Sequence, residues 1–457
     1  MDIQVPHLKN LKGQVWVSGN KNAALSVIAA SLLCKNKVTL YNIPNITDVG
    51  IFLDFLRSIG VGVTYNAEEE ILHLDYTTLK KKKTLVIKDV GRLSKIRAVI
   101  LLLAGLIARF EKVKFMGGFT GCSLGSRPLT VHFENLEKLG VEVVYKPEYI
   151  QLSSKKLASQ KDSKLIWQRE RSVTATEVAL IVSTVRRGKT TIYNAASEPH
   201  VQDTVLFLRK LGVKINGLGT DSLTVDPTQA EPAESSQVEF AIKSDHHEIT
   251  TWLALSVLTK GKVEVIHNLN PQLLFPMVDA FNLFGIEVQT QRIARKAPSI
   301  KPQENEHLYV SMVKNYSIRP KTKYISGAFL TIKPAPWPGL PVDLLPLYIP
   351  LAAYTKDPVL FHNWMYDGAL FWVLELRKAG FKVLMADPHR ALVQYSKPVS
   401  RPVTFEAPYI IRATLALFIL GASLPAGANI LNADTINRAH PFFREKLQGL
   451  GADFKIL

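Results

Sequence analysis

The segment Phe207-Leu208-Arg209-Lys210-Leu211-Gly212-Val213-Lys214-Ile215 is one of six related stretches that decide the fold of this chain. The others read FLRSIGVGV ending at Val63, NLEKLGVEV ending at Val143, AFNLFGIEV ending at Val288, LELRKAGFKV ending at Val383 and KLQGLGADF ending at Phe454. Each predicts the end of a helix, a glycine turn and a strand, because a left-handed glycine closes a helix without a Cβ clash. Their recurrence predicts a chain built from repeated units.

The same two elements precede each of these stretches. A β-branched strand lies upstream, as in residues 37–42 and 189–194. Before that strand comes a strongly apolar segment, and these segments are Ala23–Cys34, Ala98–Ala108, Val178–Val185, Trp252–Leu258, about Leu344–Ala353 and Ile410–Leu420. Because these segments are apolar on nearly every face, we predict helices in the interior, shielded by the strands and by the amphipathic second helices.

The repeats predict an α/β protein of six β/α units, arranged three plus three as two domains of about equal size. We expect a discontinuous terminal domain made of residues 1–20 and 243–457. Residues 21–242 would form an inserted domain, which carries the glycine-rich segment 117–125.

Polar residues stand immediately before each apolar helix. They read Ser18-Gly19-Asn20-Lys21-Asn22, Ser94-Lys95-Ile96-Arg97, Ser172-Val173-Thr174, Ser244-Asp245-His246, Pro341-Val342-Asp343 and Tyr409-Ile410-Ile411-Arg412. Helix N-termini attract anions, because their N–H groups are unpaired and the helix dipole is positive there. If all six starts converge on one cleft between the domains, that cleft suits phosphates and carboxylates.

The charge and the cysteines narrow the class of protein. The chain has 457 residues and a formal net charge of +17, which favours anionic partners. The basic residues are dispersed and lack a nucleic-acid recognition motif, so no nucleic-acid partner is expected. The two cysteines, Cys34 and Cys122, exclude a disulfide scaffold and fit a reducing compartment. With neither a signal peptide nor a membrane-spanning run, we expect a cytoplasmic protein without a membrane partner.

We expect no cofactor and no metal. His246 and His247 are adjacent in the sequence, so their rings are not expected to face a common ligand point on a helix. The sequence leaves the oligomeric state open.

Several segments resemble the enolpyruvyl transferases, and in particular the UDP-N-acetylglucosamine 1-carboxyvinyltransferase (MurA) family. Ser18–Ala24 is similar to the opening S-G-x-K-N-A signature, and Gly121–Pro128 to the mobile catalytic loop G-C-x-I-G-x-R-P. Asn194–Pro199 with Asp203-Thr204 resembles N-A-A-x-E-P…D-T, and Gly217–Leu223 also matches. The shikimate-pathway branch begins with S-K-S, which this chain lacks.

The resemblance implies a fold of two inverse α/β-barrel-like domains with the active site in a cleft between them. It implies phosphoenolpyruvate and a UDP-amino sugar as substrates. The enolpyruvyl group would be transferred to the 3-hydroxyl of UDP-N-acetylglucosamine with release of phosphate, the first committed step of peptidoglycan synthesis. Such a protein serves cell-wall biogenesis, cell shape and cell division.

The resemblance also implies roles for individual residues. Cys122 matches the proton donor to C3 of phosphoenolpyruvate, and Asp343 matches the aspartate that handles the proton of the sugar hydroxyl. The cations that match the phosphoenolpyruvate cluster are Lys21, Arg127, Arg412 and Arg438. The implied substrate contacts are Lys21, Asn22, Arg97, Arg127, Pro128, Leu129, Thr130, Val131, Ser172, Val173, Asp343 and Leu360. Cys34 falls inside an apolar helix and is expected to be inert.

Departures from the family pattern concentrate in the fifth unit. The family's F-E-N-R reads Phe361-His362-Asn363-Trp364, which removes a carboxylate and an arginine. Elsewhere Thr174 stands where the family has a glycine, and His246 where it has an arginine. Three alternatives stay open beside the main interpretation. The departures leave room for transfer to a different nucleotide and for a non-catalytic relative. The third, a nucleic-acid-binding protein, is suggested by the charge alone.

Overall fold

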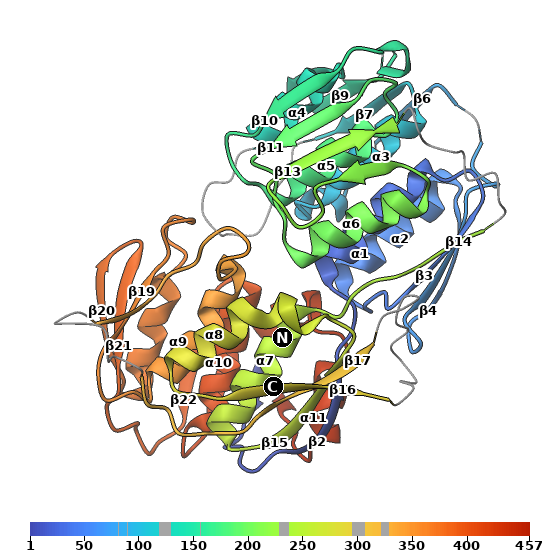
Figure 1. Ribbon diagram of the computed structural model, residues 1–457. Coiled ribbons are helices and arrows are strands. Elements are labelled where there is room, and N and C mark those ends of the chain that lie inside the picture. Colours follow the sequence, from blue (N-terminus) through green and yellow to red (C-terminus); the bar gives the residue numbers. More distant parts are fainter. Residues whose placement is uncertain are drawn as a thin grey trace. The chain divides into compact units, whose positions relative to one another are not determined.

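The computed structural model describes residues 1–80, 82–88, 90–117, 129–155, 157–227, 237–294, 307–320 and 329–457. The contacts among them divide the chain into two compact units. The terminal unit contains residues 1–18 and 244–457, and the inserted unit contains residues 19–117 and 129–243. Each unit has three four-stranded sheets, and Figure 1 shows the helices of each unit packed between the sheets.

The inserted unit contains the sheets β14-β3-β5-β4, β6-β7-β9-β8 and β10-β11-β13-β12. Their strands are β3 (Lys37–Tyr41), β4 (Gly62–Asn66), β5 (Ile71–Asp75), β6 (Thr84–Ile87), β7 (Lys112–Met116), β8 (Glu142–Lys146), β9 (Tyr149–Ser153), β10 (Lys164–Trp167), β11 (Thr190–Tyr193), β12 (Lys214–Asn216), β13 (Ser222–Asp226) and β14 (Gln237–Ala241). Each sheet has one parallel pair followed by two antiparallel pairs.

The terminal unit repeats this design in the sheets β16-β17-β15-β2, β18-β19-β21-β20 and β22-β23-β1-β24. Their strands are β1 (Ile3–Val5), β2 (Lys12–Trp16), β15 (Lys262–His267), β16 (Val288–Ile293), β17 (Leu308–Val313), β18 (Leu330–Ile332), β19 (Val359–His362), β20 (Lys382–Asp387), β21 (Arg390–Gln394), β22 (Val403–Glu406), β23 (Ala428–Leu431) and β24 (Lys455–Ile456). The two ends of the chain meet in one sheet, where β1 pairs antiparallel with β24.

Two strands are exchanged between repeats, and this exchange makes the terminal unit discontinuous. In four repeats the strand before a buried helix pairs in parallel with the strand after that helix, as β6 does with β7. The strand β2, which precedes the first helix, pairs instead with β15. The strand β14 correspondingly pairs with β3. The first and fourth repeats therefore hold each other's first strand, and the chain passes between the units twice.

The six apolar helices are buried as predicted from their composition. They are α1 (Lys21–Ala30), α3 (Val99–Arg109), α5 (Val173–Ser183), α7 (His246–Thr259), α9 (Leu345–Ala352) and α10 (Ile411–Ser423). Two of them approach very closely in the inserted unit. A Cβ at Gly105 of α3 would lie 2.2 Å from the carbonyl oxygen of Ala29 in α1, so a larger residue would force the helices apart.

The second helices of the repeats are α2 (Thr47–Ile59), α4 (Thr130–Leu139), α6 (Pro199–Lys210), α8 (Phe275–Leu283), η7 (Phe371–Ala379) and α11 (Phe443–Gly449). All six turn glycines have positive φ, from 77° to 102°, which confirms the predicted turns. The fifth second helix, η7, is a 3₁₀ helix.

Each unit has its own hydrophobic core, made by its buried helices and the inward faces of its strands. Short 3₁₀ segments complete the architecture: η1 (Ser31–Leu33), η2 (Leu93–Lys95), η3 (Leu157–Ser159), η5 (Pro271–Leu274), η6 (Val342–Leu344) and η8 (Ala433–Arg438). Among the residues that the structure describes, none of the helices combines the length and apolar character needed to cross a bilayer.

Fully buried histidines should make the folded state sensitive to acid. The His267 ring is buried beside Ser311 Oγ, 2.9 Å from Nε2, and burial lowers the pKa of His267 from 6.5 to about 3. In the unfolded chain His267 therefore binds a proton as the pH falls through about 6.5, whereas in the folded chain it stays neutral until the pH is near 3. We expect the free energy of unfolding to fall by roughly 2 kcal/mol per such histidine between pH 7 and pH 5.

Urea denaturation of wild type and His267→Gln at both pH values tests this expectation. The substitution should remove that share of the pH dependence, because glutamine does not titrate. The exposed His73 in β5 provides the control His73→Gln, which should leave the pH dependence unchanged. An unchanged pH dependence in His267→Gln would contradict the assignment.

Candidate active-site residues

Lys21 is placed by the first turn of α1 and by an ion pair. The side chain of Asn20 caps α1 by accepting hydrogen bonds from the backbone N–H groups of Asn22 and Ala23 at 2.8 and 3.1 Å. Lys21 is the first residue of the helix, and its Nζ lies 2.6 Å from Asp48 Oδ2. Asp48 lies in the first turn of α2 and is almost fully buried. Lys21 is thus a partly buried cation fixed at the positive end of a helix.

The N-termini of α4 and α5 gather five of the predicted substrate contacts in the inserted unit. Ser172 caps α5, and its Oγ accepts from the backbone N–H of Ala175 at 3.4 Å. The start of α4 lies next to it, because the two helices are joined by a hydrogen bond of 2.7 Å between His132 Nε2 and Thr174 Oγ1. The residues brought together at these two starts are Leu129, Thr130, Val131, Ser172 and Val173.

Arg97 belongs to the same neighbourhood. Burial lowers the pKa of His132 from 6.5 to about 3, and the positive charge of Arg97 lowers it further. His132 is therefore neutral at pH 7, and it lies close enough to Arg97 to feel its charge. Thr174, which stands where the resemblance implies a glycine, contacts this neutral imidazole directly.

In the terminal unit, Arg412 is at the centre of a buried polar network. It lies in the first turn of α10 and is 9% exposed. Its Nη1 lies 2.9 Å from His440 Nε2, and its Nη2 lies 3.5 Å from Asp245 Oδ2. Burial lowers the pKa of Arg412, while the negative charges of Asp245, Asp343 and Glu248 act to raise it. Asp343 and Arg412, both predicted site residues, are thus electrostatically coupled.

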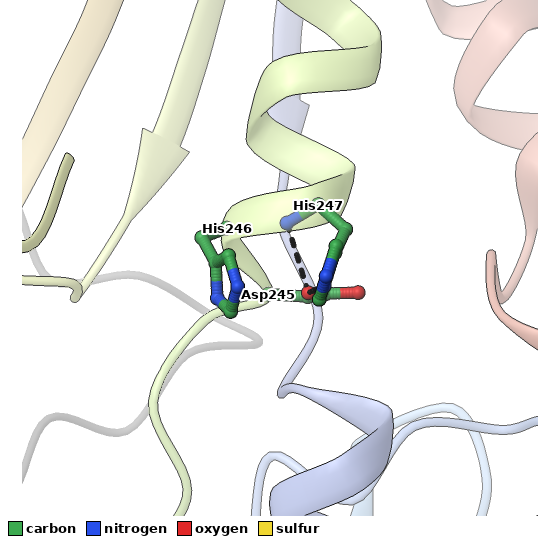
Figure 2. Close-up of side chains that lie close together, drawn as sticks. All are labelled: Asp245, His246 and His247. Carbon is green, nitrogen blue, oxygen red and sulfur yellow. Dashed lines mark hydrogen bonds and ion pairs between the residues drawn. The ribbon is translucent and has the colours of Figure 1, made fainter. Parts of the chain in front are cut away.

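Asp245, His246 and His247 lie together at the start of α7 (Figure 2). Asp245 caps the helix, and its Oδ1 lies 2.8 Å from His247 Nδ1. Although the two histidines are adjacent in the sequence, their ring centroids lie only 4.0 Å apart. One ligand atom from each of the three residues lies within 4.8 Å of the others. Rotation about the side-chain bonds brings neighbouring rings together at a helix start, where no preceding turn restricts them.

This arrangement suits a hydrogen-bonded network better than a bound cation. The two rings are tilted by only 33° with their centroids 4.0 Å apart, so their in-plane nitrogen lone pairs lie in two offset planes that are closer to parallel than to perpendicular. Two imidazoles that bind one metal ion must direct those lone pairs at a common point. Arg412 also brings a positive charge to Asp245, which opposes a second cation there.

The remaining predicted residues of the terminal unit lie in three separate elements. Asp343 is half-buried in η6, directly before α9. Arg438 ends η8, with its guanidinium carbon 5.2 Å from the centre of the Tyr409 ring. Leu360 is half-buried in β19.

Trp364, which follows β19, stands where the resemblance implies an arginine, and its indole is held by a hydrogen bond. Its Nε1 donates a hydrogen bond of 2.7 Å to the carbonyl oxygen of Pro334. Lys333 Nζ lies 5.9 Å from the centre of the indole ring, and the side chain is 47% exposed. A cation therefore remains in this region, although it comes from a different residue. Burial and the charge of Lys333 lower the pKa of the neighbouring His362.

Three predicted residues, Cys122, Arg127 and Pro128, lie outside the residues that the structure describes. The other cysteine, Cys34, is buried, and burial raises the pKa of its thiol to about 12. Its thiolate is scarce at neutral pH, which agrees with the expectation of an inert thiol.

The sequence did not single out three residues that complete the terminal network. His440 contacts Arg412, while Lys446 Nζ lies 2.6 Å from Glu248 Oε1 and 3.0 Å from Ser18 Oγ. Glu248 also accepts a hydrogen bond from Trp252 Nε1 at 3.0 Å. Only their positions in the sequence could have indicated a role for two of them. Glu248 lies three residues after the helix cap Asp245, and His440 lies two residues after the predicted site residue Arg438.

Comparison with known proteins places this arrangement in a family. The sequence profile described as EPSP synthase (3-phosphoshikimate 1-carboxyvinyltransferase) matches residues 5–447. The chain belongs to the EPSP synthase family. Within this family it is similar to proteins named UDP-N-acetylglucosamine 1-carboxyvinyltransferase. The protein from Borrelia garinii is 31% identical over 443 residues, which cover 97% of this chain and 96% of that protein. The protein from Bacteroides thetaiotaomicron is 29% identical over 452 residues, with the same coverage.

Solved structures of an enolpyruvyl transferase and of an EPSP synthase share the mixed α/β fold with its several small sheets. The enolpyruvyl transferase NikO from Streptomyces tendae superposes with a TM-score of 0.78 at 20% identity, covering 99% of this chain and 98% of that one. An EPSP synthase from Acinetobacter baumannii superposes with a TM-score of 0.68 at 14% identity, covering 99% of both chains.

The thiols of the two cysteines should differ sharply in their reactivity towards an electrophile. An epoxide phosphonate that mimics phosphoenolpyruvate should alkylate Cys122 and leave Cys34 unmodified, because the Cys34 thiol is buried with a pKa of about 12. Peptide mass mapping after treatment at neutral pH measures this, and Cys122→Ser is the control that should abolish labelling. Modification at Cys34 alone would contradict both assignments.

Proposed function

We propose that this member of the EPSP synthase family transfers the enolpyruvyl group of phosphoenolpyruvate to the 3-hydroxyl of UDP-N-acetylglucosamine, with release of phosphate. The observation that carries the proposal is similarity over nearly the whole chain to relatives named UDP-N-acetylglucosamine 1-carboxyvinyltransferase, at up to 31% identity. The proposed reaction is the first committed step of peptidoglycan synthesis. It assigns the chain to the cytoplasm and to cell-wall biogenesis.

In this proposal, cations hold the phosphate and carboxylate of phosphoenolpyruvate. Lys21, Arg412 and Arg438 provide them, together with Arg127. The structure supports Lys21 and Arg412 because each lies in the first turn of a buried helix, where the helix dipole also favours anions. Arginine suits this task, since its planar fork can bind a carboxylate or phosphate through two parallel hydrogen bonds.

Two groups move the protons in the proposed reaction. The oxygen of the sugar 3-hydroxyl forms a bond to C2 of phosphoenolpyruvate, and Asp343 takes the proton of that hydroxyl. Cys122 delivers a proton to C3, which gives a tetrahedral adduct that still carries the phosphate. Loss of the phosphate and of one C3 proton then regenerates the double bond. The charge coupling of Asp343 to Arg412 supports its placement among the cations.

The nucleotide sugar is assigned to the inserted domain. Asn22, Arg97, Ser172 and Val173 would contact it, along with the stretch 127–131. The helix starts that bring most of these residues together support this assignment. We propose that the terminal domain (residues 1–20 and 243–457) and the inserted domain (residues 21–242) are inverse α/β barrels that hold the substrates in a cleft between them. Leu360 and Asp343 would complete it from the terminal side.

A second candidate is transfer of the enolpyruvyl group to a different nucleotide. Thr174 favours it, because its hydroxyl binds His132 and its methyl group occupies space that a glycine would leave open. A changed acceptor pocket would keep the chemistry of Cys122, Asp343 and Lys21 but alter which nucleotide fits.

A phosphate-release assay with phosphoenolpyruvate and a panel of acceptors separates the two candidates. The panel contains UDP-N-acetylglucosamine, other UDP-sugars and UMP. We expect phosphate release to be fastest with UDP-N-acetylglucosamine and to require Asp343, so that Asp343→Asn lowers kcat by roughly 100-fold or more. Faster release with another nucleotide would support the second candidate, and release with none would contradict both.

Restoring the family residues in the fifth unit should improve phosphoenolpyruvate binding. An arginine at position 364 adds a charged hydrogen bond to the carboxylate, so Trp364→Arg with His362→Glu should lower the KM for phosphoenolpyruvate about tenfold. The paired glutamate avoids an arginine without a partner. Phe371→Arg is the matched control, because it replaces another exposed aromatic residue, 54% exposed, outside the proposed site.

Steady-state kinetics of the three proteins provides the measurement. An equal fall in KM for Phe371→Arg would show a general charge effect. If the wild type turned over no nucleotide sugar while the double variant did, the proposed activity of the natural chain would be wrong.

A further inference from the structure

We propose that His440 and Asp245 are positioning residues that hold the Arg412 guanidinium in the orientation needed to bind an anionic substrate group, with His440 acting as a neutral hydrogen-bond acceptor. This inference rests on the proposed function, because that function makes Arg412 a ligand of phosphoenolpyruvate. It assigns a role to a histidine that neither the sequence motifs nor the proposed reaction uses.

The contact with Arg412 determines the protonation state of His440. Arginine has five N–H donors and no acceptor, so in the 2.9 Å contact Arg412 Nη1 donates and His440 Nε2 accepts. An accepting Nε2 carries no proton, and the neutral ring therefore has its proton on Nδ1. A protonated His440 would bring two donors and two positive charges together at this distance. Geometry alone thus requires a neutral imidazole.

Asp245 fixes the other side of the guanidinium. Its Oδ2 lies 3.5 Å from Arg412 Nη2, and its Oδ1 accepts from the backbone N–H of His247 at 3.0 Å. The carboxylate is held as the cap of α7, while His440 follows η8 and Arg412 belongs to α10. Residues from three parts of the terminal unit therefore meet at the guanidinium, which is contacted on both of its Nη atoms. Five donors exceed what these two contacts use, which leaves donors for a ligand.

The charges around the network explain why a neutral acceptor is suitable here. Burial, together with the charges of Arg412, Lys446 and His247, lowers the pKa of His440 well below its usual range, although Asp245 acts to raise it. Burial alone would raise the pKa of Asp245, but His247, Arg412 and His246 hold it below its usual range. Asp245 is thus ionised beside Arg412. A second carboxylate at position 440 would overcompensate the guanidinium charge and weaken anion binding.

A merely structural role is the competing explanation. His440 is 1% exposed and its ring centre lies 5.9 Å from that of Phe443, so removing it could lower stability without affecting substrate. Such a role would not distinguish phosphoenolpyruvate from the nucleotide sugar. It would also not be rescued by a different residue that accepts a hydrogen bond at the same place.

The test compares His440→Phe, which keeps a ring but removes the acceptor, with His440→Gln, whose amide oxygen can accept from Arg412. We expect His440→Phe to raise the KM for phosphoenolpyruvate about tenfold or more, the effect of losing a hydrogen bond to a charged group. The KM for UDP-N-acetylglucosamine should stay within about twofold of wild type. His440→Gln should recover most of the loss. His267→Phe is the matched control, because it removes another fully buried neutral histidine of the same unit.

Two further measurements separate failure of this inference from failure of the proposed function. Nitrogen-15 NMR of the wild-type imidazoles should show His440 neutral, with its proton on Nδ1. Calorimetric titration with phosphoenolpyruvate measures binding without turnover. Suppose that the wild type is inactive, but that it binds phosphoenolpyruvate about tenfold more tightly than His440→Phe does. That result would refute the proposed function and support the positioning role.

Three results would overturn the positioning role. The first is an active wild type with an unchanged KM for phosphoenolpyruvate in His440→Phe. The second is an equal rise in that KM for His267→Phe. The third is a His440 that carries its proton on Nε2.

Discussion

The fold depends on one constraint: its central helices are apolar on nearly every face and must be shielded from water by other elements. A helix such as α3, whose residues Val99–Ile107 are all buried, cannot lie at a surface and must be enclosed on all sides. Strands and second helices provide that cover in each repeat, so neither a single sheet nor a simple helical bundle would suffice. The close approach of α1 and α3 at Gly105 shows how tightly such helices pack.

The first and fourth repeats exchange their first strands, and this exchange positions two residues of the candidate site. The strand β2 pairs with β15 of the terminal unit, yet the helix that follows β2 is α1 of the inserted unit. Conversely, the strand β14 pairs with β3 of the inserted unit, while the helix that follows it, α7, belongs to the terminal unit. Lys21 and Asp245 therefore stand directly after the two points at which the chain passes from one unit to the other. Their backbones are fixed there, because Asn20 N–H donates to Lys243 O and Asp245 N–H donates to Ser18 O.

Several buried charges in each unit are paired, which offsets the cost of removing them from water. Lys21 is paired with Asp48, Lys243 with Asp203, and Lys446 with Glu248. Arg412 differs, because one of its neighbours is a neutral imidazole and the other a carboxylate at 3.5 Å. Partial compensation leaves this guanidinium better suited to attract an anion than a fully paired cation would be.

The sequence by itself determined the repeat, the six turns and the buried helices, because glycine at a helix end and apolar residues on every face are local properties. It also determined the family, through near-continuous similarity along the chain. Tertiary structure alone decided that β2 and β14 change places, since the pattern of a strand does not specify which parallel neighbour it takes. It likewise decided the close approach of the His246 and His247 rings and the contact of His440 with Arg412. The rings of His246 and His247 meet through their rotamers at the helix start, and His440 lies 28 residues from Arg412 in the sequence, so no local pattern encodes either contact.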